Sequence, residues 1–338
     1  MTDTGTRRNE AAKAPIARGR YAPSPTGRIH LGNARTALAA WLSVRRQQGV
    51  FVWRLEDLDA ARTVPGLAEA AVEDLQWLGI DWDEGPGAGG AFGPYVQSTR
   101  TDRYDAALRR LHQAGRLFPC ARSRKDLEAL SSAPHGAETA PYPAALRPAD
   151  VPPGWFEALM AAPAPEASIR FRVEDGEVEL EDRVYGTLRE RVSEAVGDFV
   201  LRRRDGYYAY QLAVVVDDLQ MGITEVVRGA DLLWSTPRQI QLIEALGGVR
   251  PAYGHVPLVL NAEGQKLSKR DAGLALGALH DAGIRPEQVV GYLAHSLGLL
   301  PAPRPIAPPE LIPLFDWGRI GREDWVLPAD PAKAIAGV

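Results

Sequence analysis

Residues 20–36 read RYAPSPTGRIHLGNART, and this stretch decides the fold. A short strand at 19–22 runs into a loop rich in Pro and Gly. A helix is predicted over 29–46, because apolar residues recur there at steps of three and four. A buried strand is predicted next, over 50–58. Strand, loop, helix and strand in this order form a βαβ unit, so we expect an α/β fold with a parallel sheet.

The junction between the first strand and its helix is suited to a polyphosphate. Backbone N–H groups and the positive end of the helix dipole meet at such a junction. Gly32 lets a flat ring or a phosphate approach the backbone closely. His30 can donate a hydrogen bond to phosphate charge as it develops. The alternative is that His30 has no chemical role and that Thr26 caps the helix in an ordinary turn.

A second group of charged residues, RLEDLD, stands at 54–59, where the second strand ends. Ligands of open α/β sheets bind at the C-terminal ends of the strands. Arg54 and Glu56 lie on one face of the strand, so Glu56 could hold a substrate ammonium group. The three carboxylates of Glu56, Asp57 and Asp59 could instead hold Mg²⁺. A third possibility is a surface cluster of ion pairs.

A third group comprises YYAYQLAVVVDD at 207–218 and EVVRGADL at 225–232. Apolar runs that end in polar residues predict buried strands with charges at their tips. We expect a hairpin of strands at 199–203 and 207–216 around an Asp-Gly turn. Arg228 could meet a ligand carboxylate with two hydrogen bonds, or it could form only a structural pair with Asp231.

A fourth group, KLSKR at 266–270, follows a predicted strand at 256–260. Lys266 and Lys269 flank Ser268 in a loop. Two such lysines can neutralise a pyrophosphate as it leaves. Taken alone, the string is equally compatible with a solvated loop tip.

The composition is that of a folded globular protein. The chain has 338 residues, of which 45% are hydrophobic and 24% are charged, and its net charge is −4. That length suffices for two packed lobes. Cys120 is the single cysteine, so no disulfide can form within the chain, which fits a reducing cytoplasm. No apolar run reaches about 18 residues, so we expect no membrane span. We expect a cytoplasmic monomer.

The four groups, in this order, resemble the glutamyl-type class I aminoacyl-tRNA synthetases. HLGN stands where that class has its HIGH signature, and KLSKR stands where it has KMSKS. The similarity runs from about Gly19 to Asp271. It implies a Rossmann-like parallel-sheet catalytic core that binds ATP with Mg²⁺ and forms an aminoacyl-adenylate. It also implies an inserted subdomain that faces the acceptor end of tRNA.

The resemblance implies a role for each matching residue. The implied glutamate site consists of Arg20, Ala22, Ser24, Glu56, Tyr210 and Arg228. The implied ATP site consists of His30, Gly32, Asn33, Ser268 and Lys269, and the implied catalytic residues are His30, Lys266 and Lys269. In the implied glutamate site, Arg20 and Arg228 read the side-chain carboxylate while Glu56 holds the ammonium group. Two cations and one anion suit a dianionic amino acid.

The expected domain organisation follows from the same resemblance. It consists of a disordered tail at 1–18, the two halves of the catalytic core at 19–117 and 196–275, an acceptor-facing insert at 118–195 and a short helical, Pro-rich segment at 276–338. We expect no anticodon-binding domain, because the last segment is too short for one.

The short last segment is similar to that of a truncated family, the glutamyl-Q tRNA(Asp) synthetases. That family attaches glutamate to queuosine at the wobble position of tRNA(Asp). One alternative is a minimal glutamyl-tRNA synthetase that charges tRNA(Glu). Another is a non-catalytic paralogue that binds RNA or glutamate.

The sequence departs from the family at its zinc region. Members often carry Cys-x-Cys and then Tyr-x3-Cys, but here Arg122 and Leu146 stand at two of the cysteine positions. A Zn²⁺ site needs about four ligands, which Cys120, Tyr142 and His135 do not supply. We therefore expect no zinc, and a partly buried thiol at Cys120.

Overall fold

The structure is a computed structural model that describes residues 16–122, 126, 141–267 and 269–338, with 269, 270 and 272 described by their backbone alone. Its centre is a six-stranded sheet with the order β2-β1-β8-β9-β5-β6. The strands are β1 (Arg18–Tyr21), β2 (Val50–Trp53), β5 (Val178–Asp182), β6 (Gly186–Glu190), β8 (Glu225–Gly229) and β9 (Ala252–Val256). All neighbouring pairs are parallel except β5 and β6. The expected α/β class with a parallel sheet is confirmed.

The βαβ unit predicted from the opening stretch is present. Helix α1 (Leu31–Arg46) connects β1 to β2, and Arg20 pairs with Val52 in the parallel register. The helix is capped by His30, whose Nδ1 accepts hydrogen bonds from the backbone N–H groups of Gly32 at 3.1 Å and Asn33 at 3.4 Å. The alternative that Thr26 caps this helix is therefore wrong.

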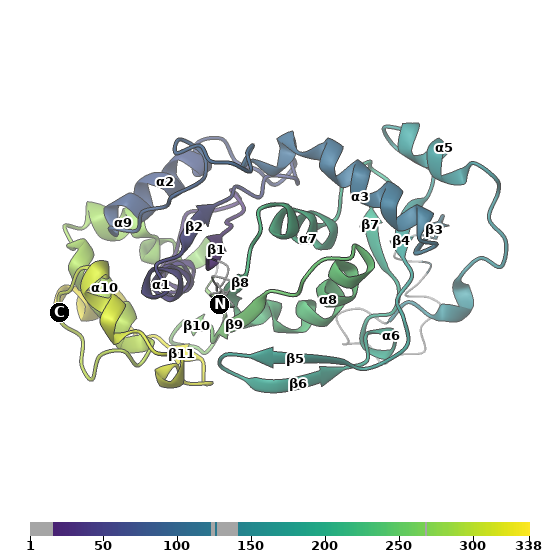
Figure 1. The fold of residues 1–338 in the computed structure, drawn as a ribbon. Helices are drawn as coiled ribbons and strands as arrows, with labels where there is room; N and C mark the ends of the chain where they lie inside the picture. The colour runs from purple at the N-terminus through teal and green to yellow at the C-terminus, as the bar shows by residue number, and fades with distance from the viewer. Residues whose placement is uncertain (1–15, 123–125, 127–140, 268) are drawn as a thin grey trace, which may run out of the picture.

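The sheet separates two apolar cores, and the strands show it by alternation. In β2, Phe51 and Trp53 belong to one core and Val52 belongs to the other. The first core is covered by α1 together with the C-terminal helices, and the second by α3, α7 and α8 (Figure 1). The helices of these layers are α3 (Thr101–Gln113), α7 (Tyr210–Gln220), α8 (Thr236–Ala245), α9 (Leu276–Asp281), α10 (Pro286–Ser296), α11 (Pro308–Leu311) and α12 (Pro331–Ala336). Helix α2 (Leu67–Trp77) adds Ala71 and Leu75 to the first core. The shorter elements are α5 (Trp155–Ala161), α6 (Val192–Ala195), β10 (Val259–Leu260) and β11 (Trp325–Val326).

The expected hairpin strand at 207–216 is wrong, because most of this segment is helix α7. A bridge between Arg202 and Tyr208 forms the expected turn, and the helix begins at Tyr210. Residues 212–216 are all buried. A helix that is apolar on every side shows no amphipathic period, so its apolar run is indistinguishable from that of a buried strand.

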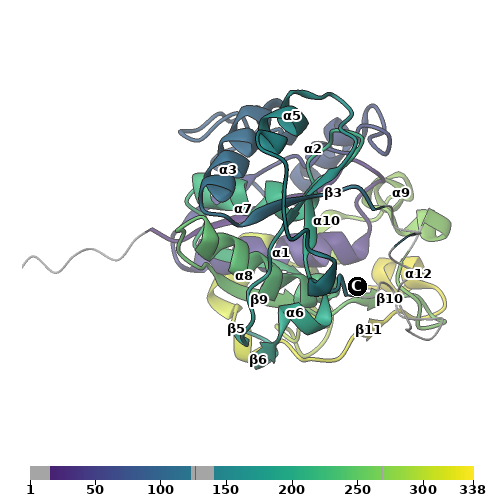
Figure 2. The ribbon, with the colours of Figure 1, turned by 90° about the vertical axis from the view of Figure 1, so that its right-hand side faces the viewer.

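The segment after α3 supplies strands to two different sheets. An antiparallel three-stranded sheet consists of β3 (Leu117–Cys120), β4 (Ser168–Phe171) and β7 (Phe199–Arg202). The strands β5 and β6 lie instead at the edge of the central sheet, where Asp182 pairs with Tyr253 of β9 (Figure 2). The chain between α3 and β7, expected to form one inserted subdomain, therefore contributes strands to two sheets. None of the described helices is long and apolar enough to cross a membrane.

Candidate active site

A cavity of about 700 Å³ opens beyond the C-terminal ends of β1 and β8 and at the start of α1. Ligand sites of open α/β sheets lie where the chain leaves a central strand toward opposite edges, and β1 is that strand here. Ten predicted site residues line this cavity: Arg20, Ala22, Ser24, His30, Gly32, Asn33, Glu56, Tyr210, Arg228 and Lys266. The predicted Ser268 and the side chain of Lys269 lie outside the described residues.

His30 directly precedes α1, and its Nδ1 is occupied by the hydrogen bonds of the helix cap. Because Nδ1 accepts from two N–H groups, a neutral ring carries its proton on Nε2. Burial, and then the charge of Lys266, lowers the pKa of His30, which favours that neutral form. A Cβ at Gly32 would meet the His30 ring at 3.1 Å. The sequence suggests that the glycine at position 32 makes room for a ligand. In the structure it also makes room for the His30 imidazole.

Lys266 and Asp231 form an ion pair at the cavity wall. The side chain of Lys266 is 58% exposed, so the pair sits at the rim, where solvent screens it. Asp231 pairs with this lysine rather than with Arg228. The alternative of a structural Arg228–Asp231 pair is therefore wrong, and Asp231 joins the candidate site.

Arg228, near the end of β8, is buried and donates three hydrogen bonds, the longest of them from Nη2 to the Leu232 carbonyl at 3.4 Å. Its Nε donates to Nε2 of His255 at 3.0 Å, and its Nη2 donates to Oγ1 of Thr236 at 2.8 Å. Its Nη1 has no hydrogen-bond partner among the described residues. A buried guanidinium nitrogen without a partner is costly, so the geometry suits an anionic ligand that would accept from it.

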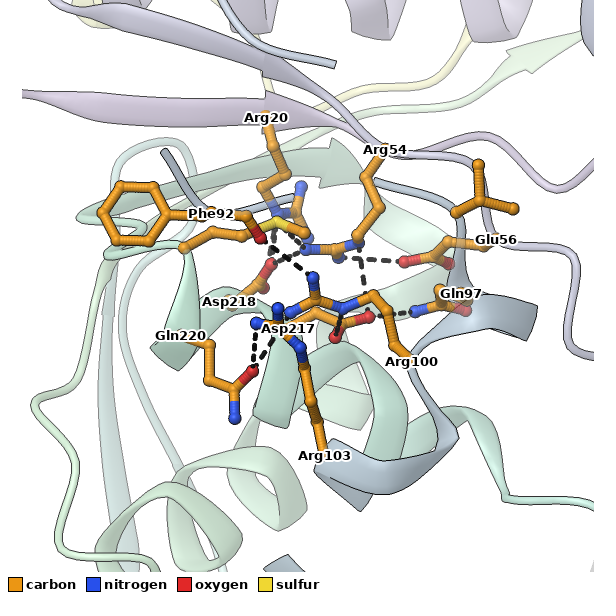
Figure 3. Close-up of polar contacts among 12 residues, drawn as sticks. Arg20, Arg54, Glu56, Phe92, Gln97, Arg100, Arg103, Asp217, Asp218 and Gln220 are labelled. Atoms are coloured by element: carbon orange, nitrogen blue, oxygen red, sulfur yellow. Dashed lines mark hydrogen bonds and ion pairs between the residues drawn. The ribbon is translucent and has the colours of Figure 1, made fainter. Parts of the chain in front are cut away.

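Two arginines, one in β1 and one directly after β2, meet at one carboxylate of α7 (Figure 3). Nη1 of Arg54 donates to Asp218 at 2.7 Å, and Nε of Arg20 donates to the same carboxylate at 3.2 Å. Nη2 of Arg54 donates to Glu56 at 2.9 Å. Arg54 is fully buried and Glu56 is only 9% exposed, so the possibility of a surface cluster of ion pairs is wrong.

Asp217 lies next to Asp218 and has its own set of donors. Arg100 donates to it at 2.6 Å, Gln97 at 2.8 Å and Tyr104 at 2.9 Å. Two carboxylates in the last turn of a helix oppose its dipole. The surrounding arginines offset this cost and fix the end of α7 against the sheet. Sequence reasoning missed these donors, because they lie more than a hundred positions from Asp217.

The cluster carries more positive than negative charge. Four guanidinium groups, of Arg20, Arg54, Arg100 and Arg228, lie near three carboxylates, of Glu56, Asp217 and Asp218. Burial raises the pKa of Glu56, and this effect outweighs the opposite influence of Arg54. One positive charge is left for a ligand with one net negative charge.

The three acids at 56–59 do not converge on a metal. Glu56 pairs with Arg54, while Asp57 accepts from the backbone N–H of Ser98 at 2.8 Å and from its hydroxyl at 2.6 Å. Within the described ranges, no group of three or more His, Cys, Asp or Glu side chains could hold a metal ion. The alternative of a carboxylate magnesium site formed by these residues is therefore wrong.

The region of the missing zinc ligands is a small packed cluster. Sγ of Cys120 lies 3.7 Å from the Tyr142 hydroxyl, which donates to the Leu146 carbonyl at 3.1 Å. The guanidinium of Arg170 lies 4.3 Å from the centre of the Tyr142 ring. Cys120 is buried rather than partly buried, at 4% exposure. His135, the third residue considered for zinc, lies outside the described residues.

Comparison with known proteins places this geometry in a family context. Residues 17–302 match the family described as tRNA synthetases class I (E and Q), catalytic domain. The glutamyl-Q tRNA(Asp) synthetase of Symbiobacterium thermophilum is 50% identical over 321 residues, which cover 94% of this chain and 98% of that protein. The enzyme of the same name from Nitratidesulfovibrio vulgaris is 45% identical over 93% of this chain and 96% of its own length.

A solved structure shows the same fold. The glutamate tRNA ligase from Elizabethkingia meningosepticum, crystallised in complex with its amino acid, superposes with a TM-score of 0.81 at 30% identity. The alignment covers 94% of this chain and 68% of the ligase.

Proposed function

Because this chain belongs to the glutamyl-Q tRNA(Asp) synthetases, within the class I synthetases of the E and Q group, we propose that it activates L-glutamate with ATP and transfers the glutamyl group to queuosine at the wobble position of tRNA(Asp). It is a ligase of the aminoacyl-tRNA synthetase type, and its family uses ATP, glutamate and tRNA.

The unpartnered Nη1 of Arg228 is the observation that carries the choice of glutamate. Arg228 lines the cavity, and the buried charge cluster beside it carries a surplus of one positive charge. The side-chain carboxylate of glutamate would accept from Arg228, and Glu56 would hold the ammonium group. Glutamine would bring no net charge and would leave the surplus uncompensated, so the site discriminates against it.

In the first step, an oxygen of the α-carboxylate of glutamate attacks the α-phosphorus of ATP. The bond from that phosphorus to the bridging oxygen of the pyrophosphate breaks, and pyrophosphate leaves with the electron pair. The Nε2–H of His30 would donate to the phosphate charge, and Lys266 would neutralise the leaving group. Lys269 and Ser268 are assigned to the same phosphates from the sequence. Mg²⁺ would be held mainly by the ATP phosphates and water, because the described residues around the cavity offer no carboxylate cage for it.

In the second step, a nucleophile of queuosine attacks the carbonyl carbon of the glutamyl-adenylate. The bond from this carbon to the phosphate oxygen breaks, and AMP leaves. No covalent enzyme intermediate is needed. The same proposal includes tRNA(Asp) as the acceptor. It also includes a monomeric enzyme in the cytoplasm that binds no zinc. The domain boundaries, among them the insert at 118–195, also remain predictions.

The alternative of a minimal glutamyl-tRNA synthetase has weaker support. The glutamyl-Q relative is 50% identical to this chain over 98% of its own length, whereas glutamate–tRNA ligases are 42–43% identical over only 57% of theirs. A non-catalytic paralogue is disfavoured as well, because a pure binder would have no use for the positive charge of Lys266 beside the cavity.

Transfer of radiolabelled glutamate to three purified tRNAs tests the proposal. These are tRNA(Asp) with queuosine, tRNA(Asp) without it, and tRNA(Glu). Label on the queuosine-containing tRNA alone is the expected result. Label on tRNA(Glu) would make the chain a minimal glutamyl-tRNA synthetase. The variant Glu56→Gln is the negative control: label that it still transfers comes from a contaminating host enzyme.

A further inference from the structure

Behind Arg228, and outside the cavity lining, lies a buried pair of Asp182 and His255. Oδ2 of Asp182 lies 2.6 Å from Nδ1 of His255, and neither side chain has any exposed surface. Oδ1 of Asp182 accepts from the backbone N–H groups of Val184 at 2.9 Å and Tyr185 at 3.0 Å. The carboxylate is therefore fixed by the turn that leads from β5 to β6.

The hydrogen bonds on both sides of the imidazole define its tautomer. A guanidinium nitrogen can only donate, so the 3.0 Å contact from Arg228 Nε requires an unprotonated Nε2 on His255. Nδ1 then carries the proton and donates a hydrogen bond to Asp182. Burial, with the positive charge of Arg228, lowers the pKa of His255, and the Asp182 hydrogen bond opposes this effect. A neutral imidazole in one tautomer fits all of these contacts.

This arrangement fixes the plane of the guanidinium. Arg228 is held at Nε by His255 and at Nη2 by Thr236, whose hydroxyl also lies 3.2 Å from Nε2 of the imidazole. The guanidinium is planar, so two fixed nitrogens determine the direction of the third. That third nitrogen, Nη1, is the one without a partner among the described residues.

We propose that Asp182 and His255 are positioning residues that set the direction of the free Nη1 of Arg228, and thereby the preference of this enzyme for glutamate over glutamine. The inference rests on the proposed function, since it concerns the same amino acid site. Neither residue lines the cavity, so neither touches the substrate. The competing explanation is that the pair only stabilises the junction of β5, β8 and β9.

Two substitutions of His255 separate these explanations. The carboxamide of His255→Gln can place an acceptor near the former Nε2, facing Arg228, but loses the donor to Asp182. The carboxamide of His255→Asn can keep a donor near the former Nδ1, facing Asp182, but loses the acceptor for Arg228. A structural role predicts that Asn is the milder change, because it retains the buried hydrogen bond to a charge. A positioning role predicts the reverse for glutamate binding.

The measurement is glutamate-dependent pyrophosphate exchange, with KM and kcat determined for glutamate, glutamine and ATP. We expect His255→Asn to have a KM for glutamate at least about tenfold above that of His255→Gln, with the KM for ATP unchanged in both. The ratio of kcat/KM for glutamate to kcat/KM for glutamine should also be lower in His255→Asn than in His255→Gln. Equal KM values for glutamate, or a parallel rise of the KM for ATP, would overturn the inference. Failure of the unsubstituted enzyme to exchange with glutamate would instead overturn the proposed function.

A measurement on the unsubstituted protein covers the case in which a variant does not fold. Nitrogen-15 NMR of the histidine side chains distinguishes the Nδ1–H tautomer, the Nε2–H tautomer and the imidazolium form. We expect His255 to be neutral with its proton on Nδ1 at pH 7. In Asp182→Asn, the amide can donate to Nδ1 and so favours the Nε2–H tautomer, which sets a donor against Arg228. An Nε2–H or charged His255 in the unsubstituted protein would refute the inference.

Discussion

Asp218 and Arg54 are joined by a hydrogen bond of 2.7 Å between Oδ1 and Nη1, at a place where the Arg54 side chain has no exposed surface. The arginine follows β2 and the aspartate lies on α7, so the contact connects the sheet to a helix of the second core. Removing one partner of a buried pair leaves the other charge uncompensated, which costs more than the pair itself contributes.

Asp218→Asn should lower the free energy of unfolding by about 3 kcal/mol at pH 7, because Arg54 and Arg20 lose the charge between them. Glu179→Gln is the matched control: Glu179 accepts from the exposed Arg189 at 2.7 Å, and its loss should cost under about 1 kcal/mol. Urea unfolding measures both. Equal losses in the two variants would contradict the structural assignment.

The same carboxylate predicts a pH dependence of stability. Burial alone would raise the pKa of Asp218, but Arg20 and Arg54 together hold it below its ordinary value. The folded state thus holds the proton less tightly than the unfolded chain, whose aspartates titrate near about 3.9. The stabilisation is complete above that pH and is lost as the pH falls through the lower folded value. The acid limb of the unfolding curve should flatten in Asp218→Asn.

Glu56 predicts a different pH effect, on substrate binding. Burial raises its pKa, so it takes up a proton at a higher pH than an ordinary glutamate, for which the value is about 4.3. A protonated Glu56 offers no charge to an ammonium group. The KM for glutamate should therefore rise as the pH falls, while the KM for ATP stays constant over the same range. Glu56→Gln should raise the KM for glutamate by about 10- to 100-fold and abolish this pH dependence.

His30 has two roles that one pair of variants can separate. Asparagine is a good helix cap, so His30→Asn should unfold like the unsubstituted protein, whereas His30→Ala should lose about 1 kcal/mol. Both lack the Nε2–H donor, and both should lower kcat of pyrophosphate exchange by about 10²- to 10³-fold. Near-normal activity in His30→Asn would show that the residue is only a cap.

The pair of Lys266 and Asp231 predicts a change in rate without a change in stability. Because Lys266 is largely exposed, Lys266→Met should alter the free energy of unfolding by less than about 0.5 kcal/mol. It should slow pyrophosphate exchange by about 10- to 100-fold, since a charge beside the leaving group is lost. Asp231→Asn releases the lysine and should lower the KM for ATP. A KM for ATP that rises in Asp231→Asn would instead assign the aspartate to ATP binding.

The parts of the fold that the sequence could predict are those with a local signal. The helix that begins after His30 and the strand that precedes Arg54 both follow from apolar spacing, and the strand ends place charged residues where a ligand binds. Ten predicted residues do line one cavity. The helix that starts at Tyr210 could not be predicted, because a buried apolar run has no period that distinguishes a helix from a strand.

The second layer of the site could not be predicted for another reason. Asp182 and His255 are 73 positions apart, and each alone looks like an ordinary polar residue near a strand. Their contact exists only because β5 joins the central sheet beside β9, a pairing that leaves no mark in either segment. The donors to Asp217 share this property. What a residue touches through the sheet is a matter of topology, which local spacing does not encode.

The placement of the β5–β6 hairpin bears on how this enzyme can be divided or recombined. The segment between α3 and β7 looks separable in the sequence, yet it supplies two strands to the edge of the catalytic sheet. A chimaera that exchanged this whole segment with that of a relative would also exchange Asp182, and with it the support behind Arg228. A graft that preserves amino acid specificity should therefore leave residues 178–190 in place and exchange only the chain on either side.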